Sequence, residues 1–156
     1  PRSGESEGAN LRINCGGDAC GDFIQDPSTY LHVSQTYDAT LPVLNEIYRT
    51  ARFGRHNLSY NFKVKRGETY KVMLHFIEPW YGASRSEQTD YEGIRIFDVA
   101  FNNTTVINDL DIWAQAGFAR PYVRTINYKA DADVLKIHFP EVKAGQDLLK
   151  GNTKDK

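Results

Sequence analysis

Alternation of apolar and polar residues in the middle of the chain is the feature that most restricts its possible folds. In segment 58–64 apolar residues occupy every second position, and segment 69–77 repeats the pattern. Because successive side chains of a β-strand point to opposite faces, both segments are predicted to be strands with one apolar face. The polar turn at 66–68 predicts that these two strands pair as a hairpin.

Four further segments carry strand patterns, and short polar turns join them in two pairs, 94–102 with 104–108 and 122–130 with 134–139. Each pair is predicted to form a hairpin, which gives at least six strands in all. Only segment 41–50, with a proline near its start, has the pattern of a short helix. Many short strands without alternating long helices predict an all-β fold, and we favour an antiparallel β-sandwich over a barrel.

The length of the chain, 156 residues, suits one domain with a substantial core and is too short for two. Its two ends are polar, so we expect a linker or remnant at 1–10 and a polar tail at 150–156 around a single domain at 11–149. The chain starts at Pro1 rather than methionine. We therefore interpret it as a piece of a larger protein, whose flanking domains are among its expected partners.

Charge and motifs exclude several classes of function. The 19 Lys and Arg against 20 Asp and Glu leave a net charge of -1, which argues against binding to nucleic acid or to an anionic membrane surface. The four histidines lie far apart without the spacing of metal ligands, and neither a nucleophile motif nor a glycine-rich phosphate loop is present. We expect no cofactor and no metal.

Three carboxylates are candidates for catalytic or metal-binding groups. Asp109 and Asp111 are two residues apart and would share a strand face, and Glu78 directly precedes a proline and an aromatic pair. A glycosidase pair or a calcium site is one interpretation. The alternative, which we favour, is that both aspartates bond to loop backbone and that Glu78 pairs with an arginine or caps a turn. For Cys15 and Cys20, a small disulfide and two unpaired thiols are both consistent with the sequence.

The stretch "HFIEPWYGAS" begins as a strand and continues into Pro79, Trp80 and Tyr81, where a polar turn would be expected. One interpretation is that the two rings cover the core. The other is that they form a platform, because the apolar C–H face of a sugar ring stacks on an aromatic face while its hydroxyls bond to nearby polar groups. The pattern alone leaves both open.

Motifs spread along most of the chain resemble the malectin domain. They occur in the family's order between Leu11 and Gln146, as "RINCGG", "YDATLPVL", "YRTARFG", "YKVMLHFIEPWY", "IFDVAFNNTTVINDLDIWAQAG" and "LKIHFP". The resemblance is greatest for the malectin-like carbohydrate-binding modules attached to bacterial glycoside hydrolases. It implies a jelly-roll-like sandwich whose loops at one end hold a glucose-containing oligosaccharide between aromatic side chains, without catalysis.

The resemblance also implies a set of ligand-binding residues. Transferred motif by motif, they are Tyr37, Phe53, Trp80, Tyr81 and Asp147. We therefore predict a noncatalytic module that binds oligo- or polysaccharide, needs no cofactor and targets a parent glycoside hydrolase, in an extracellular or periplasmic location. The alternative is a structural or protein-interaction domain of a larger multidomain protein.

Three departures from the family pattern affect the details of this prediction. Phe53 lacks a hydroxyl that is common in the family, and Pro79 with Trp80 changes the shape of the aromatic platform. The family also ends in a further strand rich in isoleucine and alanine, whereas this chain finishes "QDLLKGNTKDK". We expect the place of that strand to be short and solvent-facing.

Overall fold

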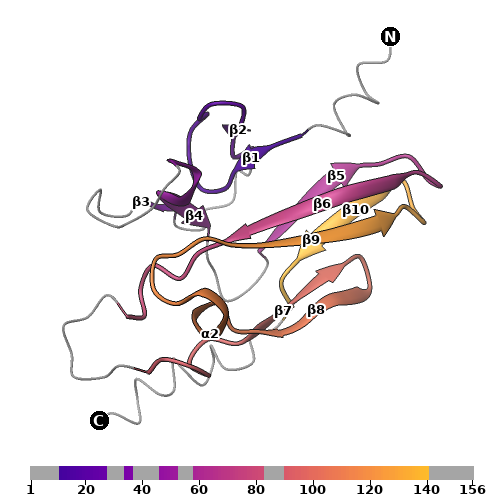
Figure 1. Ribbon diagram of the computed structural model, residues 1–156. Coiled ribbons are helices and arrows are strands. Elements are labelled where there is room, and N and C mark those ends of the chain that lie inside the picture. The colour runs from indigo at the N-terminus through magenta and orange to yellow at the C-terminus, as the bar shows by residue number, and fades with distance from the viewer. Residues whose placement is uncertain (1–10, 28–33, 37–45, 53–57, 83–89, 141–156) are drawn as a thin grey trace.

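The structure, a computed structural model, describes residues 11–27, 34–36, 46–52, 58–82 and 90–140 (Figure 1). Nearly all of the regular structure in these residues is β. In chain order the elements are β1 (Ile13–Asn14), β2 (Ile24–Gln25), β3 (Ser34–Thr36), the 3₁₀ helix η1 (Glu46–Tyr48), β4 (Thr50–Arg52), β5 (Ser59–Lys63), β6 (Thr69–Phe76), β7 (Phe97–Phe101), β8 (Thr104–Leu110), α2 (Ile112–Ala116), β9 (Tyr122–Lys129) and β10 (Val134–His138).

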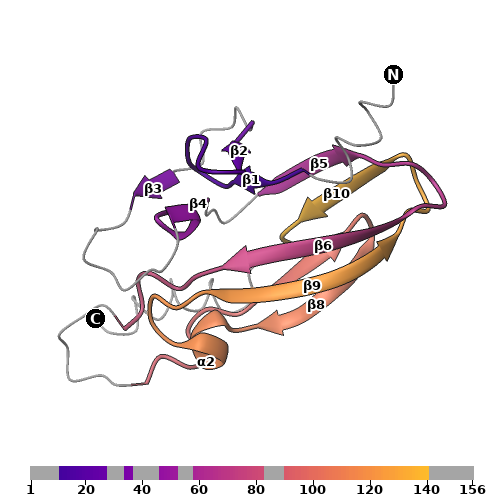
Figure 2. The ribbon, with the colours of Figure 1, turned by 45° about the horizontal axis from the view of Figure 1, so that its top comes forward.

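The longer strands form two layers (Figures 1 and 2). One layer is a four-stranded antiparallel sheet in the order β5-β10-β7-β8, and the other is the antiparallel pair β6-β9. Two smaller pairs, the parallel β1-β2 and the antiparallel β3-β4, lie together beside β5 and β6 (Figure 2). The predicted antiparallel β-sandwich is confirmed.

The core lies between the two layers. The four-stranded sheet and α2 supply its buried side chains, which are Phe97, Val99, Phe101, Ile107, Leu110, Ile112, Leu135 and Ile137. The β6-β9 pair packs against them with every second residue, as the alternation predicted. Ring contacts join the layers at both ends. The ring centroids of Phe76 and Phe97 are 6.0 Å apart, and those of Phe101 and Tyr128 are 5.7 Å apart.

Of the three predicted hairpins, one is confirmed and two are wrong. The chain turns back from β7 to β8 as expected. In contrast, β5 pairs with β10 and β6 pairs with β9, so neither 58–64 with 69–77 nor 122–130 with 134–139 forms a hairpin. The two connecting turns instead cross between the sheets side by side, with the Gly67 N–H donating to the Ala130 carbonyl at 2.8 Å. This crossing lets the apolar faces of successive strands meet across the core.

The helical prediction for 41–50 is met only by η1, and residues 41–45 lie outside the described residues. An unpredicted α-helix, α2, follows β8 directly. Asp111 caps its start by accepting a hydrogen bond from the Ala114 N–H at 3.0 Å, so the chain enters a helix where a strand face was expected. Among the described residues, no helix is long and apolar enough to cross a membrane.

Candidate functional site

The segment after β6 carries the two aromatic residues that the sequence singled out. Ile77 and Glu78 still lie in the interior, with Glu78 only 1% exposed. Two residues later Trp80 is 62% exposed, whereas Tyr81 is half-buried. Trp80 therefore does not cover the core, and its ring is accessible at one end of the sandwich, as the platform interpretation requires.

Glu78 determines how this segment leaves the strand. Its Oε1 accepts hydrogen bonds from the backbone N–H groups of Trp80 at 3.0 Å and Tyr81 at 3.2 Å. Its Oε2 lies 2.8 Å from Nε of Arg95, a residue just before β7. The prediction that Glu78 pairs with an arginine or caps a turn is confirmed in both parts. A carboxylate that is buried, paired and bonded in this way is engaged in structure rather than available for acid–base chemistry.

Arg95 also contacts the aromatic pair. Its guanidinium lies over the ring of Tyr81, 5.2 Å from the ring centroid, which is a cation–π distance. The side chain of Arg95 is 34% exposed, so the contact forms at the surface of the site. One arginine thus connects the buried carboxylate and the half-buried ring.

Further rings continue inward from Tyr81. Tyr91 lies 6.0 Å from Tyr81 and 5.8 Å from Trp113 of α2, so three rings form a row from the surface to the helix. Burial raises the pKa of the Tyr81 hydroxyl, with the Glu78 carboxylate adding to the rise and Arg95 opposing it. The phenol is therefore protonated at neutral pH and can both donate and accept a hydrogen bond.

A second buried charge pair lies in the small sheets. Asp26, which follows β2, and Arg52, at the end of β4, are 3.0 Å apart, with side chains 5% and 6% exposed. The hydroxyl of Tyr60 donates to Asp26 at 2.8 Å, and the Gly16 N–H donates to the same carboxylate oxygen at 2.7 Å. Arg52 also lies over the Tyr60 ring. The pair therefore fixes the chain immediately before Phe53.

The predicted site residues are only partly within the described structure. It places Trp80 and Tyr81 together at one end of the sandwich. The other three predicted ligand residues, Tyr37, Phe53 and Asp147, lie outside the described residues.

The candidate carboxylates have structural contacts. Asp111 caps α2 and accepts the Gly93 N–H at 2.6 Å, which confirms bonding to loop backbone. The prediction that Asp109 and Asp111 share a strand face is wrong, because Asp109 has a φ of 53° and β8 ends one residue before Asp111. Within the described part of the chain, no three His, Cys, Asp or Glu side chains come together as metal ligands, and Cys15 and Cys20 are free thiols.

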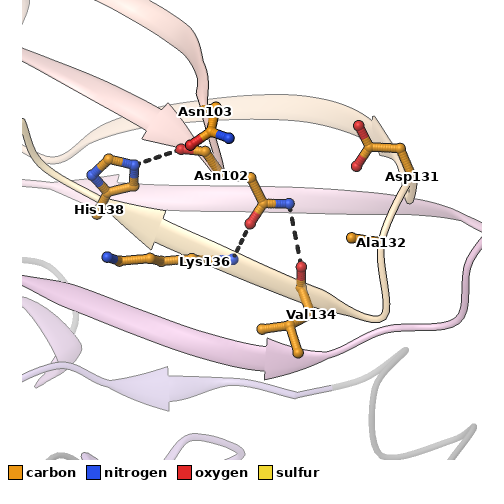
Figure 3. A pocket seen from close by; sticks show the side chains of 7 residues that line it. All are labelled: Asn102, Asn103, Asp131, Ala132, Val134, Lys136 and His138. Carbon is orange, nitrogen blue, oxygen red and sulfur yellow. Dashed lines mark hydrogen bonds between the residues drawn. The ribbon is translucent and has the colours of Figure 1, made fainter.

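A polar hollow of about 480 Å³ lies at the other end of the sandwich, between the β7–β8 turn and the start of β10 (Figure 3). The Asn102 side chain lines it, donating to the Val134 carbonyl at 3.2 Å and accepting from the Lys136 N–H at 2.8 Å. His138 Nε2 lies 2.6 Å from the Asn102 carbonyl oxygen. These bonds hold the β7–β8 turn against β10. The polar side chains of the hollow that make them therefore have a structural role.

Sequence reasoning missed three residues of the aromatic end: Arg95, Tyr91 and Trp113. Arg95 directly precedes the family motif "IFDVAFNNTTVINDLDIWAQAG", and Trp113 lies within it. Their contacts with Glu78, Tyr81 and one another come from separate elements. Only the fold brings these elements together.

Comparison with known proteins supports the family resemblance. The family model of the Malectin domain matches residues 9–155. Malectin of Mus musculus is 28% identical over 127 residues, which cover 74% of this chain and 41% of the mouse protein. A probable LRR receptor-like serine/threonine-protein kinase of Arabidopsis thaliana is 30% identical over 139 residues, covering 85% of this chain and 13% of the kinase. The chain spans less than half the length of these curated relatives.

Solved structures share the fold. A Bacteroides uniformis β-glucuronidase 2, covalently bound to cyclophellitol-6-carboxylate aziridine, matches with a TM-score of 0.69 at 16% identity, covering 92% of this chain and 17% of the enzyme. The plant receptor-like kinase ANX1 also matches with a TM-score of 0.69, at 20% identity, covering 86% of this chain and 43% of that structure. The same β architecture therefore occurs within both an enzyme and a receptor.

Proposed function

The chain belongs to the malectin family, and from that premise we propose that it is a noncatalytic module that binds oligo- or polysaccharide at the aromatic end of the sandwich. The observation that carries the proposal is the exposure of Trp80: at 62%, a large apolar ring is presented to solvent beside a half-buried tyrosine. A soluble ligand with an apolar face and polar edges fits such a surface. Sugars have this character.

The proposed mechanism is stacking with polar orientation. A sugar ring lies against Trp80, and the protonated Tyr81 hydroxyl and nearby loop groups orient its hydroxyls. The full proposed set of ligand residues remains Tyr37, Phe53, Trp80, Tyr81 and Asp147. Because an open site desolvates few polar groups, we expect a dissociation constant in the micromolar to millimolar range, roughly -4 to -8 kcal/mol.

The wider context is also a proposal. We propose that the module belongs to a larger extracellular or periplasmic protein and that its role is to hold a glycoside hydrolase on its polysaccharide substrate. The match to a bacterial β-glucuronidase is consistent with this context at the level of fold. The receptor-like kinases among the relatives instead favour the second candidate, a protein-interaction domain of a receptor-type protein.

The central experiment is a glycan-array screen followed by calorimetric titration of glucose-containing oligosaccharides. Trp80→Ala is expected to weaken binding by about 1–3 kcal/mol without changing the melting temperature, because the ring carries stacking area rather than core packing. Tyr37→Ala is expected to weaken binding to a similar degree. Met73→Ala serves as the control, since it removes another exposed apolar side chain, 52% exposed, from the outer face of β6.

A further variant, Trp80→Phe, separates the contribution of an aromatic ring to binding from the contribution of Trp80 to the fluorescence signal. The chain contains two tryptophans, and the second, Trp113, lies behind Tyr91. Trp80→Phe should retain most of the affinity by calorimetry while losing the sugar-dependent change in tryptophan fluorescence. If Trp80→Ala unfolds the domain, or binds sugar as the wild type does, the platform is refuted. If no di- or oligosaccharide binds at millimolar concentration while a flanking domain does, the protein-interaction function is the correct one.

A further inference from the structure

The backbone of the aromatic segment is held by a single carboxylate oxygen. Oε1 of Glu78 accepts the N–H groups of both Trp80 and Tyr81, the two residues whose rings form the proposed platform. Hydrogen bonds to an ionised acceptor are stronger than bonds to a neutral one. The direction in which both residues leave the strand is therefore fixed by the side chain that precedes them.

The second oxygen of Glu78 closes a ring of contacts. Oε2 pairs with Arg95, and the Arg95 guanidinium lies over Tyr81, whose own N–H bonds back to Glu78. Each of the three residues thus contacts the other two. The hydrogen bond to Glu78 holds the Tyr81 backbone, and the Arg95 guanidinium covers one face of the Tyr81 ring.

This ring of contacts is attached to rigid parts of the fold. The Glu78 side chain is only 2% exposed, and its backbone carbonyl accepts the N–H of the fully buried Ala119 at 2.8 Å. Arg95 lies two residues before Phe97, a core residue at the start of β7. The position of the platform is therefore tied to β6 and β7, and through them to the core.

A buried ion pair contributes little net stability compared with apolar packing of the same volume, because both charges lose their hydration. Its contribution here is geometric. A shallow stacking site supplies little binding free energy. If its rings had to become ordered when the sugar binds, the entropy lost would lower the affinity directly. Holding the segment in place before the sugar arrives removes that cost.

We infer that Glu78 and Arg95 are positioning residues for the Trp80–Tyr81 platform, acting on sugar affinity without contacting the sugar through their paired atoms. This inference rests on the proposed sugar-binding function. It assigns the affinity of the site to a pair of charges as well as to the rings.

The test combines two readouts that respond to different causes. Amide hydrogen exchange at Trp80 and Tyr81 reports the two bonds to Glu78 directly, and titration with the best oligosaccharide from the array reports affinity. In Glu78→Gln, which replaces the carboxylate with a neutral amide, both amides are expected to exchange faster and the affinity to fall, each by about tenfold. Arg95→Lys keeps a positive charge and should retain more affinity than Arg95→Met.

Val99→Ala is the matched control. It removes buried core volume at a residue with 0% exposure, lowering stability without touching the segment, and its affinity below the melting temperature should equal that of the wild type. Slow exchange at both amides in Glu78→Gln would overturn the inference, as would fast exchange with wild-type affinity. If the wild type binds no sugar, the proposed function fails, whereas the exchange rates still decide whether Glu78 holds the segment.

Discussion

Gly82 ends the aromatic segment in a conformation and a space that only glycine fits. Its φ of +94° lies in the left-handed half of backbone space, which side chains disfavour. A Cβ at this position would lie 2.7 Å from the Cβ of Phe118 and 3.1 Å from Nε1 of Trp113. The close approach lets the end of the segment pack directly on the side chains of α2 and the loop that follows it.

Gly82→Ala is expected to lower the free energy of unfolding by about 2–4 kcal/mol, combining a backbone cost of about 1–2 kcal/mol with a steric clash. Gly93→Ala provides the matched control, since its φ is +79° but a Cβ there would meet nothing within 4 Å. Its loss should be limited to about 1–2 kcal/mol. Urea unfolding measures both variants, and equal losses would show that the contacts with Phe118 and Trp113 are not restrictive.

At the scale of residues, the sequence predicted roles that depend on a residue and its immediate neighbours. A glutamate two residues before an aromatic pair is a local pattern, and Glu78 behaves as that pattern indicated. The pattern left two interpretations of Trp80 open, and its exposure excludes the one in which the ring covers the core. The identity of the Glu78 partner could not be predicted in the same way. Arg95 lies 17 positions further along, and nothing short of the fold distinguishes it from the other arginines.

At the scale of elements, the β7–β8 turn is bound to β10 by one asparagine. Asn102 has a φ of 53°, and its side chain bonds to the Tyr128 hydroxyl as well as to backbone groups of β10. These bonds continue the sheet beyond the last paired residues of β7 and β10, which are Phe101 with Ile137. The Asn102 side chain therefore bonds to the β10 backbone at positions where the β7 backbone no longer pairs with β10.

Two substitutions separate the backbone and side-chain contributions of Asn102. Asn102→Gly tolerates the positive φ but loses the side-chain bonds, and should lower the free energy of unfolding by about 1–3 kcal/mol. Asn102→Ala loses the bonds and also strains the backbone, and should cost about 1 kcal/mol more. Chemical denaturation measures both. Asn102→Gly with wild-type stability would contradict a structural role for the side chain.

Strand positions were predictable because the period of two is local. Every strand from β5 to β10 falls in a segment predicted to be one, except that β8 continues two residues beyond its predicted segment, to Leu110. Strand partners were not. The turn of residues 66–68 suits a hairpin as well as a crossing between sheets, and only the need to bury two apolar faces against each other selects the crossing. The asparagine turn at β7–β8 carried a stronger local signal, and its hairpin prediction was correct.

At the scale of the whole molecule, the small N-terminal sheets join the sandwich through polar and aromatic contacts. Tyr60 of β5 bonds to Asp26, and His75 of β6 contacts both Tyr48 of η1 and the ring of Phe23. These contacts link residues that precede β5 in the chain with both layers of the sandwich. None of them follows from strand patterning, since the elements concerned are only two or three residues long.

We expect His75 to make this junction sensitive to pH. The residue as a whole is exposed, but the ring centroids of Phe23 and Tyr48 lie 6.1 and 5.9 Å from that of its imidazole. Desolvation lowers its pKa below the usual value of 6.5, and its Nδ1 lies 2.8 Å from the Tyr48 hydroxyl. Between 6.5 and the lowered value, the unfolded chain binds a proton that the folded protein does not. The contribution of His75 to stability is therefore fully present above pH 6.5, falls as the pH drops below it, and is lost once the pH passes the folded pKa.

His75→Gln tests this dependence, because glutamine can still bond to the Tyr48 hydroxyl but does not titrate. We expect the free energy of unfolding of the wild type to fall more steeply than that of the variant between about pH 7 and about pH 5.5, where carboxylates contribute least to the slope. Urea unfolding at several pH values measures both slopes. Parallel slopes for the two proteins would place the pH sensitivity elsewhere, and a steeper slope for His75→Gln would show that the folded state favours the charged histidine.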